Sequence, residues 1–140
     1  MPELLKKSEE NIYSANLLID NERYSSSVHC SYYACYQRLM NLISVEYGYD
    51  YEDINKEMRE YNKALHPTKK IGSHDFLIKN KLNDLVRREK IDDHRLVNDL
   101  MILKTFRHKS DYKNVEISQE ESRKALELSK EVIERLIKIS

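Results

Sequence analysis

The stretch from residue 100 to residue 114 combines an apolar helical pattern with side chains that phosphate chemistry uses. Leu96, Leu100 and Leu103 recur at helical spacing, and the next position on that stripe is Arg107. The pattern therefore puts a guanidinium where another leucine is expected. Because a planar guanidinium matches the geometry of a phosphate, Arg107 is the residue best suited to stabilise charge on phosphorus.

Three further residues on the same predicted helix have side chains that can take part in such chemistry. Histidine changes charge near neutral pH, so His108 can shuttle protons, and Asp111 or Tyr112 can orient it. His108 lies four residues before Tyr112, which makes the two neighbours on the helix surface. Arg107 and His108 differ by about 100° around the helix, so they share a site only where the helix edge faces a groove.

The same residues also fit a purely structural role. Arg107 and Asp111 are spaced for an ion pair within one helix, which needs no function. Basic side chains are favourable in the last turn of a helix, where carbonyl groups lack partners, and Lys104, Lys109 and Lys113 fit that rule. Spacing alone does not separate the structural interpretation from the chemical one.

Other side chains are candidates for binding a nucleotide or RNA. His29 and Tyr33 share one face of a predicted helix, and Lys104 and Lys109 carry charges that can meet a phosphate. The rings of Tyr32, Tyr33 and Tyr36 could stack on bases. Tyrosines on a helix are more often core or interface residues, and we favour that interpretation for these three. His74 follows a predicted helix start, where we expect an exposed polar side chain.

The length of the chain predicts one domain over residues 1–140, and its balanced charge predicts no overall electrostatic field. The 140 residues include 24 Lys and Arg and 24 Asp and Glu, so the formal net charge is zero. The charges are uneven, because residues 1–22 carry two basic and five acidic side chains whereas residues 63–95 carry nine basic and five acidic ones. Any contact with a polyanion is therefore expected in the second half of the chain.

Cysteine placement and motif content favour a cytoplasmic protein without a metal or cofactor. Cys30 and Cys35 lie on one predicted helix and point in different directions, which argues against a disulfide between them. We find no apolar run of membrane-spanning length, no signal-peptide pattern, no metal-ligand spacing and no glycine-rich phosphate loop. The sequence therefore predicts no membrane contact, no bound metal and no cofactor.

Only two Gly and two Pro interrupt the chain, which favours long helices. Apolar periodicity predicts helices over residues 3–21, 24–47, 74–88, 92–112 and 118–139. Residues 49–68 have helix-forming composition but little apolar face, and we interpret them as a loosely packed helix or a partly mobile excursion. The expected fold is all-α: an up-and-down antiparallel bundle of four main helices plus one or two short helices.

Local signals mark the ends of these helices. Gly48 is expected to end the second helix in a left-handed conformation. Ser73 and either Asp92 or Asp93 are placed to cap the helices that follow them, and Ser118 with Glu121 forms the pattern of a capping box.

Two segments in this order resemble the HEPN superfamily (higher eukaryotes and prokaryotes nucleotide-binding domains). Residues 16–37, NLLIDNERYSSSVHCSYYACYQ, look like a helix end, a short turn and a helix rich in small residues and tyrosine. Residues 103–136 look like the closing element of the superfamily, with Arg107 shortly before a Ser-Asp-Tyr tripeptide and a long final helix after it. Between them, residues 69–77, KKIGSHDFL, resemble the Lys…His segment of one small, poorly characterised bacterial and archaeal branch.

This resemblance implies a helical bundle that forms a homodimer side by side. It also implies a role in RNA cleavage, often as the toxin of a toxin–antitoxin pair whose partner is a nucleotidyltransferase. Catalytic members carry an arginine, usually followed by a polar residue, with a histidine several residues further on, and Arg107 matches the arginine. The window in which the histidine is expected holds Tyr112, Lys113 and Asn114, and His108 directly follows the arginine instead.

Two hypotheses about function follow. The first is a metal-independent ribonuclease of a toxin–antitoxin or defence system, with Arg107 on the RNA phosphate and His108, Asp111 and Tyr112 completing the catalytic set. The second is a non-catalytic dimeric module that binds a partner protein or a nucleotide through the same surface.

Overall fold

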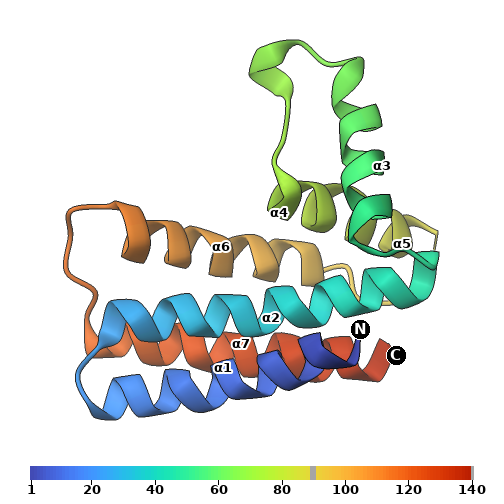
Figure 1. Ribbon diagram of the computed structural model, residues 1–140. Coiled ribbons are helices and arrows are strands. Elements are labelled where there is room, and N and C mark those ends of the chain that lie inside the picture. The colour runs from blue at the N-terminus through green and yellow to red at the C-terminus, as the bar shows by residue number, and fades with distance from the viewer. Residues whose placement is uncertain (89–90, 140) are drawn as a thin grey trace.

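The computed structural model describes residues 1–88 and 91–139, and within those ranges every regular element is helical. The predicted all-α class is therefore confirmed (Figure 1). In chain order the elements are α1 (Pro2–Asp20), α2 (Tyr24–Tyr47), α3 (Tyr51–Lys63), the 3₁₀ turn η1 (Pro67–Lys69), α4 (Ser73–Asp75), the π-helix η2 (Phe76–Leu82), α5 (Asn83–Arg87), α6 (Leu96–Tyr112) and α7 (Gln119–Ile139).

Helix α2 lies at the centre and packs against α1, α6 and α7 (Figure 1). Its apolar positions are buried as predicted, since Val28, Tyr32 and Leu39 are almost inaccessible to water. The small side chain of Ser27 lets α1 approach closely, and its hydroxyl donates a hydrogen bond of 2.8 Å to the Ala15 carbonyl. A central helix of this kind is apolar over a wide arc, because it has neighbours on several sides.

Turn chemistry at the helix ends agrees with the sequence in two places. Gly48 ends α2 with φ of 68°, a left-handed conformation that favours glycine. Before α7, the Glu121 amide donates to the Ser118 hydroxyl at 3.0 Å and the Ser118 amide donates to Glu121 at 3.3 Å, which confirms the predicted capping box.

The leucine stripe of α6 is confirmed, but its predicted cap is wrong. Leu96, Leu100 and Leu103 are fully buried. The helix begins after Arg95 without a side-chain cap, because the Asp93 carboxylate is used elsewhere and Asp92 is exposed. Arg135 of α7 donates to Asp93 from Nε at 2.6 Å and from Nη2 at 2.8 Å, a paired geometry stronger than a single capping bond.

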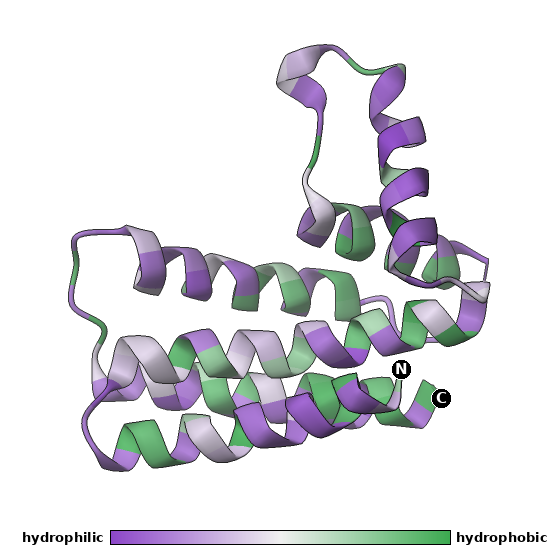
Figure 2. Ribbon diagram, in the orientation of Figure 1, coloured by the Kyte–Doolittle hydropathy of each residue, from purple (hydrophilic) through white to green (hydrophobic). Residues whose placement is uncertain are grey.

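Residues 49–71 form an arm that projects from the packed helices (Figure 1). Its helix α3 starts with a reciprocal capping box between Asp50 and Asp53, and only Ile54 of the helix is buried. Figure 2 shows α3 as almost continuously hydrophilic, which agrees with the little apolar face expected there. The returning chain is held by Asn62, whose side chain exchanges two hydrogen bonds of 3.0 and 3.1 Å with the backbone of Ile71.

After the arm, residues 73–87 form one helical run that contains the π-helix η2. The sequence predicts burial of Phe76 or Leu77, yet both are buried, because the wider turn of a π-helix changes which side chains share a face. The prediction of Ser73 as a cap is wrong. Gly72 occupies the capping position, and this helix start has no side-chain cap.

None of the helices in the described ranges combines the length and the apolar composition needed to cross a bilayer.

Candidate functional site

The guanidinium of Arg107 lies among three aromatic rings contributed by α2 and α6. Its central carbon is 5.2 Å from the ring centre of Tyr32, 5.8 Å from that of Tyr33 and 5.7 Å from that of Tyr112. A guanidinium is weakly hydrated and is attracted to the faces of aromatic rings, which explains how a cation can occupy a position next to the leucine stripe. The side chain is only 11% exposed.

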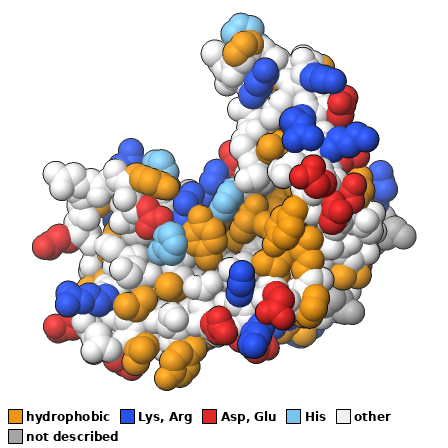
Figure 3. Space-filling view, in the orientation of Figure 1, with side chains coloured by type: hydrophobic (Ala, Val, Ile, Leu, Met, Phe, Trp, Pro, Cys, Tyr) orange, Lys and Arg blue, Asp and Glu red, His pale blue; other side chains and the backbone are white. Residues whose placement is uncertain are grey.

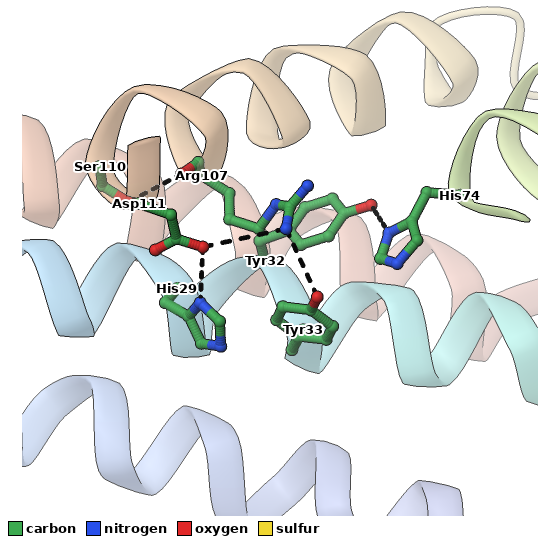
Figure 4. A network of polar contacts seen from close by, with 7 residues as sticks. All are labelled: His29, Tyr32, Tyr33, His74, Arg107, Ser110 and Asp111. Atoms are coloured by element: carbon green, nitrogen blue, oxygen red, sulfur yellow. Dashed lines mark hydrogen bonds and ion pairs between the residues drawn. The ribbon is translucent and has the colours of Figure 1, made fainter. Parts of the chain in front are cut away.

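The polar contacts of this guanidinium are few and long. Arg107 Nη1 is 3.8 Å from Asp111 Oδ2 and 3.5 Å from the Tyr33 hydroxyl. The Nε atom is buried and has no hydrogen-bond partner among the residues that the structure describes. No residue in the described ranges accepts a hydrogen bond from Nη2, and Figure 4 shows this nitrogen without a dashed contact. Arg107 therefore keeps unused hydrogen-bond donors.

A second arginine shows what a fully paired guanidinium looks like in the same fold. Arg135 donates three hydrogen bonds, to Asp93 at 2.6 and 2.8 Å and to Asp99 at 2.7 Å. Hydrogen bonding to Asp93 holds the pKa of Arg135 above its usual range. Buried polar groups are normally paired in this way, so the unused donors of Arg107 need an explanation.

His29 and Asp111 form a close pair beside Arg107, across the gap between α2 and α6 (Figure 4). The His29 Nδ1 and Asp111 Oδ2 atoms are 2.8 Å apart. The Asp111 side chain is 19% exposed and the His29 side chain is 47% exposed, so the imidazole is open to solvent. His29 also packs on the ring of Tyr33, with ring centres 4.6 Å apart.

On the other side of Arg107, His74 is bound to the tyrosines of α2. Its Nδ1 atom is 2.6 Å from the Tyr32 hydroxyl, and its ring stacks on Tyr36 with centres 3.9 Å apart. Burial, assisted by the charges of Arg107 and Lys104, lowers the pKa of His74 from 6.5 to about 4. The ring is therefore neutral near pH 7.

The expectation that His74 is merely exposed polarity at a helix start is wrong. His74 follows the arm in the chain, and its ring stacks on Tyr32 and Tyr36 of α2 and covers them. The signal in the sequence is the close spacing of Tyr32, Tyr33 and Tyr36, because such a cluster needs a cover.

The other predicted site residues lie around this centre with partners of their own. The ring of His108 packs against Tyr112, with centres 5.2 Å apart. Lys104 is paired with Asp75. Lys109 is paired with Glu121 of α7 at 2.6 Å. The structure thus brings Arg107, Asp111, His29, Tyr33 and Tyr112 together and gives the two lysines structural ion pairs.

A polar pocket adjoins the His29–Asp111 pair. It has a volume of about 460 Å³ and is lined by Ser25, Ser26, His29, Cys30, Ser110, Asp111 and Tyr112. Beyond this pocket, toward the arm, the space-filling view shows hydrophobic, basic and histidine side chains gathered between α6 and the arm (Figure 3). The site therefore offers a cation, an imidazole held by a carboxylate, several hydroxyls and exposed aromatic surface.

In the described part of the chain, no three His, Cys, Asp or Glu side chains gather closely enough to hold a metal ion.

Comparison of the chain with protein-family models, with curated proteins and with solved structures finds no match.

Proposed function

We propose that this chain is a HEPN-type protein that binds RNA phosphate at Arg107 and cleaves RNA without a metal ion. The motif order over residues 16–37 and 103–136 and the all-helical structure support the proposal. In this proposal α1, α2, α6 and α7 form an up-and-down antiparallel bundle, and two copies form a homodimer. The protein then acts in the cytoplasm, as the toxin of a toxin–antitoxin pair with a nucleotidyltransferase or as a defence component.

The observation that carries the proposal is the incomplete pairing of Arg107. Within residues 1–88 and 91–139, this guanidinium is 11% exposed, its buried Nε has no partner and no acceptor lies on Nη2, which is an unfavourable arrangement unless a ligand completes it. A phosphate oxygen is the natural acceptor, because charge-assisted bonds from arginine to phosphate are short and directional. Asp111, at 3.8 Å, leaves room for such a competitor.

The proposed reaction is attack of a ribose 2′-oxygen on the adjacent phosphorus. It needs a cation for the negative charge that builds on the phosphoryl oxygens, and Arg107 supplies it. It also needs groups that transfer protons, and the imidazoles at this end of α2 and α6 are the candidates.

The test is cleavage of end-labelled single-stranded RNA in the presence of EDTA. We expect the wild type to release fragments ending in a 2′,3′-cyclic phosphate, and Arg107→Met to be slower by about 100-fold, as for loss of one charge-stabilising donor. Arg87→Met is the matched control, because Arg87 is exposed on α5. Intact RNA at high excess of wild-type protein, or equal rates for wild type and Arg107→Met, contradicts the proposal.

A second candidate is a non-catalytic homodimeric interaction module. It is favoured by Asp111, which already neutralises part of the Arg107 charge, and by an apolar groove on the outer face of α6. The groove has a volume of about 370 Å³ and is lined by Asn98, Met101, Ile102, Thr105, Phe106 and Lys109. Under this candidate, we expect sedimentation velocity to show a dimer for the wild type and a monomer for Phe106→Asp, and we expect RNA to stay intact. A monomeric wild-type protein contradicts this candidate.

A further inference from the structure

We infer that His29, held by Asp111, is the residue that takes the proton from the ribose 2′-hydroxyl, and that the pocket beside it receives one nucleotide of a single-stranded RNA. This inference rests on the proposed function and adds the residue and the subsite to it. It moves proton transfer from α6, where the resemblance places a histidine, to α2.

The first step is the protonation pattern of the imidazole. An ionised carboxylate only accepts hydrogen bonds, so the contact of 2.8 Å between Asp111 Oδ2 and His29 Nδ1 puts the hydrogen on Nδ1. In the neutral imidazole, the lone pair is then on Nε2. This is the tautomer that a general base requires, and the carboxylate also stabilises the imidazolium that forms when the base takes a proton.

The second step is the position of this base relative to the cation. One carboxylate oxygen, Asp111 Oδ2, contacts both His29 Nδ1 at 2.8 Å and Arg107 Nη1 at 3.8 Å. The imidazole and the guanidinium therefore flank the same oxygen, as Figure 4 shows. In this inference, a phosphate that binds Arg107 on the side of Asp111 lies next to His29, which is the arrangement that attack by a neighbouring 2′-oxygen needs.

The third step is the space next to the imidazole. His29 forms part of the wall of the pocket of about 460 Å³, together with Ser25 and Ser26 at the start of α2 and Tyr112 at the end of α6. This volume is in the range of small-molecule sites, about 300 to 1,000 Å³. The serine hydroxyls can bond to ribose or base, and Tyr112, a residue that is 66% exposed, can stack its ring on a base. Stacking of this kind requires an unpaired base, which selects single-stranded RNA.

His108 lacks these features. Its contact in the described part of the chain is the ring of Tyr112, and no carboxylate there orients its imidazole. It also lies about 100° around α6 from Arg107. A base needs both an orienting partner and the right tautomer, so the geometry favours His29 over His108.

The proposed step conserves atoms and charge. His29 Nε2 takes the proton of the 2′-hydroxyl, the 2′-oxygen forms a bond to phosphorus, and the bond between phosphorus and the 5′-oxygen breaks. The departing 5′-oxygen takes a proton from water, and His29 later returns its proton to solvent. The products are a 2′,3′-cyclic phosphate and a 5′-hydroxyl.

The experiment separates catalysis from binding. Cleavage of single-stranded RNA is measured in EDTA, and affinity is measured with 2′-fluoro RNA, which has no 2′-hydroxyl to attack phosphorus. We expect His29→Gln to lower the cleavage rate by about 100-fold or more, and to change the dissociation constant for 2′-fluoro RNA by less than about threefold. His94→Gln, at an exposed residue outside the site, is the matched control and keeps both values.

Asp111 is a positioning residue, so its test includes a readout beyond activity. In ¹⁵N NMR of the imidazoles, we expect wild-type His29 to carry its hydrogen on Nδ1, and Asp111→Asn to shift the tautomer population. We also expect 2′-fluoro RNA to perturb the Nε2 signal of His29 in the wild type, and not in Arg107→Met.

Each result decides between distinct conclusions. Unchanged cleavage by His29→Gln while Arg107→Met is inactive overturns the role of His29 and leaves the proposed function standing. Loss of cleavage in His108→Gln with full activity in His29→Gln assigns the base to α6 and also overturns the inference. If wild-type protein leaves RNA intact, the proposed function fails, and the role of His29 fails with it.

Discussion

Arg107 and Arg135 both carry a guanidinium on a packed helix, but only one of them is fully paired. Arg135 binds two carboxylates through short hydrogen bonds, whereas Arg107 has one distant carboxylate and aromatic faces. A residue that serves function often makes the folded protein less stable than another residue at that position would, because its hydrogen-bond donors are paired only when a ligand is bound. The difference between the two residues can therefore be measured as a difference in stability.

We expect Arg107→Met to leave the free energy of unfolding unchanged or to raise it by about 1 kcal/mol, because methionine fills the apolar position without an unpaired cation. Arg135→Met is expected to lower it by about 2 to 3 kcal/mol, because the Asp99 side chain, 10% exposed, then loses its cation. Urea unfolding at pH 7 measures both. A loss above about 2 kcal/mol for Arg107→Met contradicts the description of Arg107 as incompletely paired.

His74 gives the folded state a defined pH dependence. Its pKa is lowered from 6.5 to about 4, mainly by burial, so as the pH falls below 6.5 the unfolded chain takes up this proton before the folded chain does. The contribution of His74 therefore makes folding less favourable from pH 7 down to pH 4. We expect the stability loss between pH 7 and pH 5 to be smaller in His74→Gln than in the wild type, measured by urea unfolding at both pH values.

His94 is exposed, so His94→Gln is the control for that experiment and should follow the wild type. If His74→Gln also follows the wild type, the burial of the His74 ring against Tyr36 does not govern its titration.

At the scale of elements, α6 shows what periodicity can predict. The helical spacing of Leu96, Leu100 and Leu103 places Arg107 toward the interior, because a repeat along one helix is a local property of the sequence. The end of the helix is less predictable. Asp93 is placed to cap it, yet pairs with Arg135, which is 42 residues away in the chain. Local rules fail where a distant residue offers a stronger partner.

The arm buries little surface, so a few hydrogen bonds should determine how well it is held. Asn62 exchanges two hydrogen bonds with the backbone of Ile71, and of α3 only Ile54 is buried. We expect Asn62→Ala to speed amide exchange over residues 62–71, while exchange in α2 stays at wild-type rates. Hydrogen–deuterium exchange with mass spectrometry measures this, and Lys56→Ala, at an exposed position on α3, is the control. Equal exchange in both variants means that Asn62 does not hold the arm.

At the scale of the whole molecule, the site depends on packing that the sequence does not reveal. His29 and Asp111 are 82 residues apart in the chain, and Tyr32 and His74 are 42 residues apart. Each residue is visible as a candidate, but their pairing requires α2, α6 and the segment after the arm to be in place. This is why the all-α class and the residues of α6 follow from the sequence, whereas the dyad of His29 and Asp111 does not.

The zero net charge also affects how strongly the affinity for RNA depends on salt concentration. No overall field attracts RNA, and Lys104 and Lys109 near Arg107 are already paired with carboxylates, so we expect few phosphates to be bound at this site. We expect the logarithm of the affinity for single-stranded RNA to fall with the logarithm of salt concentration with a slope of about 1 to 2, and Arg107→Met to reduce that slope by about 0.7. A slope above about 4 indicates that RNA contacts a basic surface larger than the site around Arg107.

The most direct test is the dissociation constant of 2′-fluoro RNA for wild-type protein and for Arg107→Met, measured by fluorescence anisotropy with Arg87→Met as the control. Because a charge-assisted bond to phosphate contributes about 1.5 to 3 kcal/mol, we predict that Arg107→Met binds at least about tenfold more weakly while Arg87→Met binds like the wild type. Equal affinity for wild type and Arg107→Met, or no binding by either, contradicts the assignment of Arg107 to an RNA phosphate.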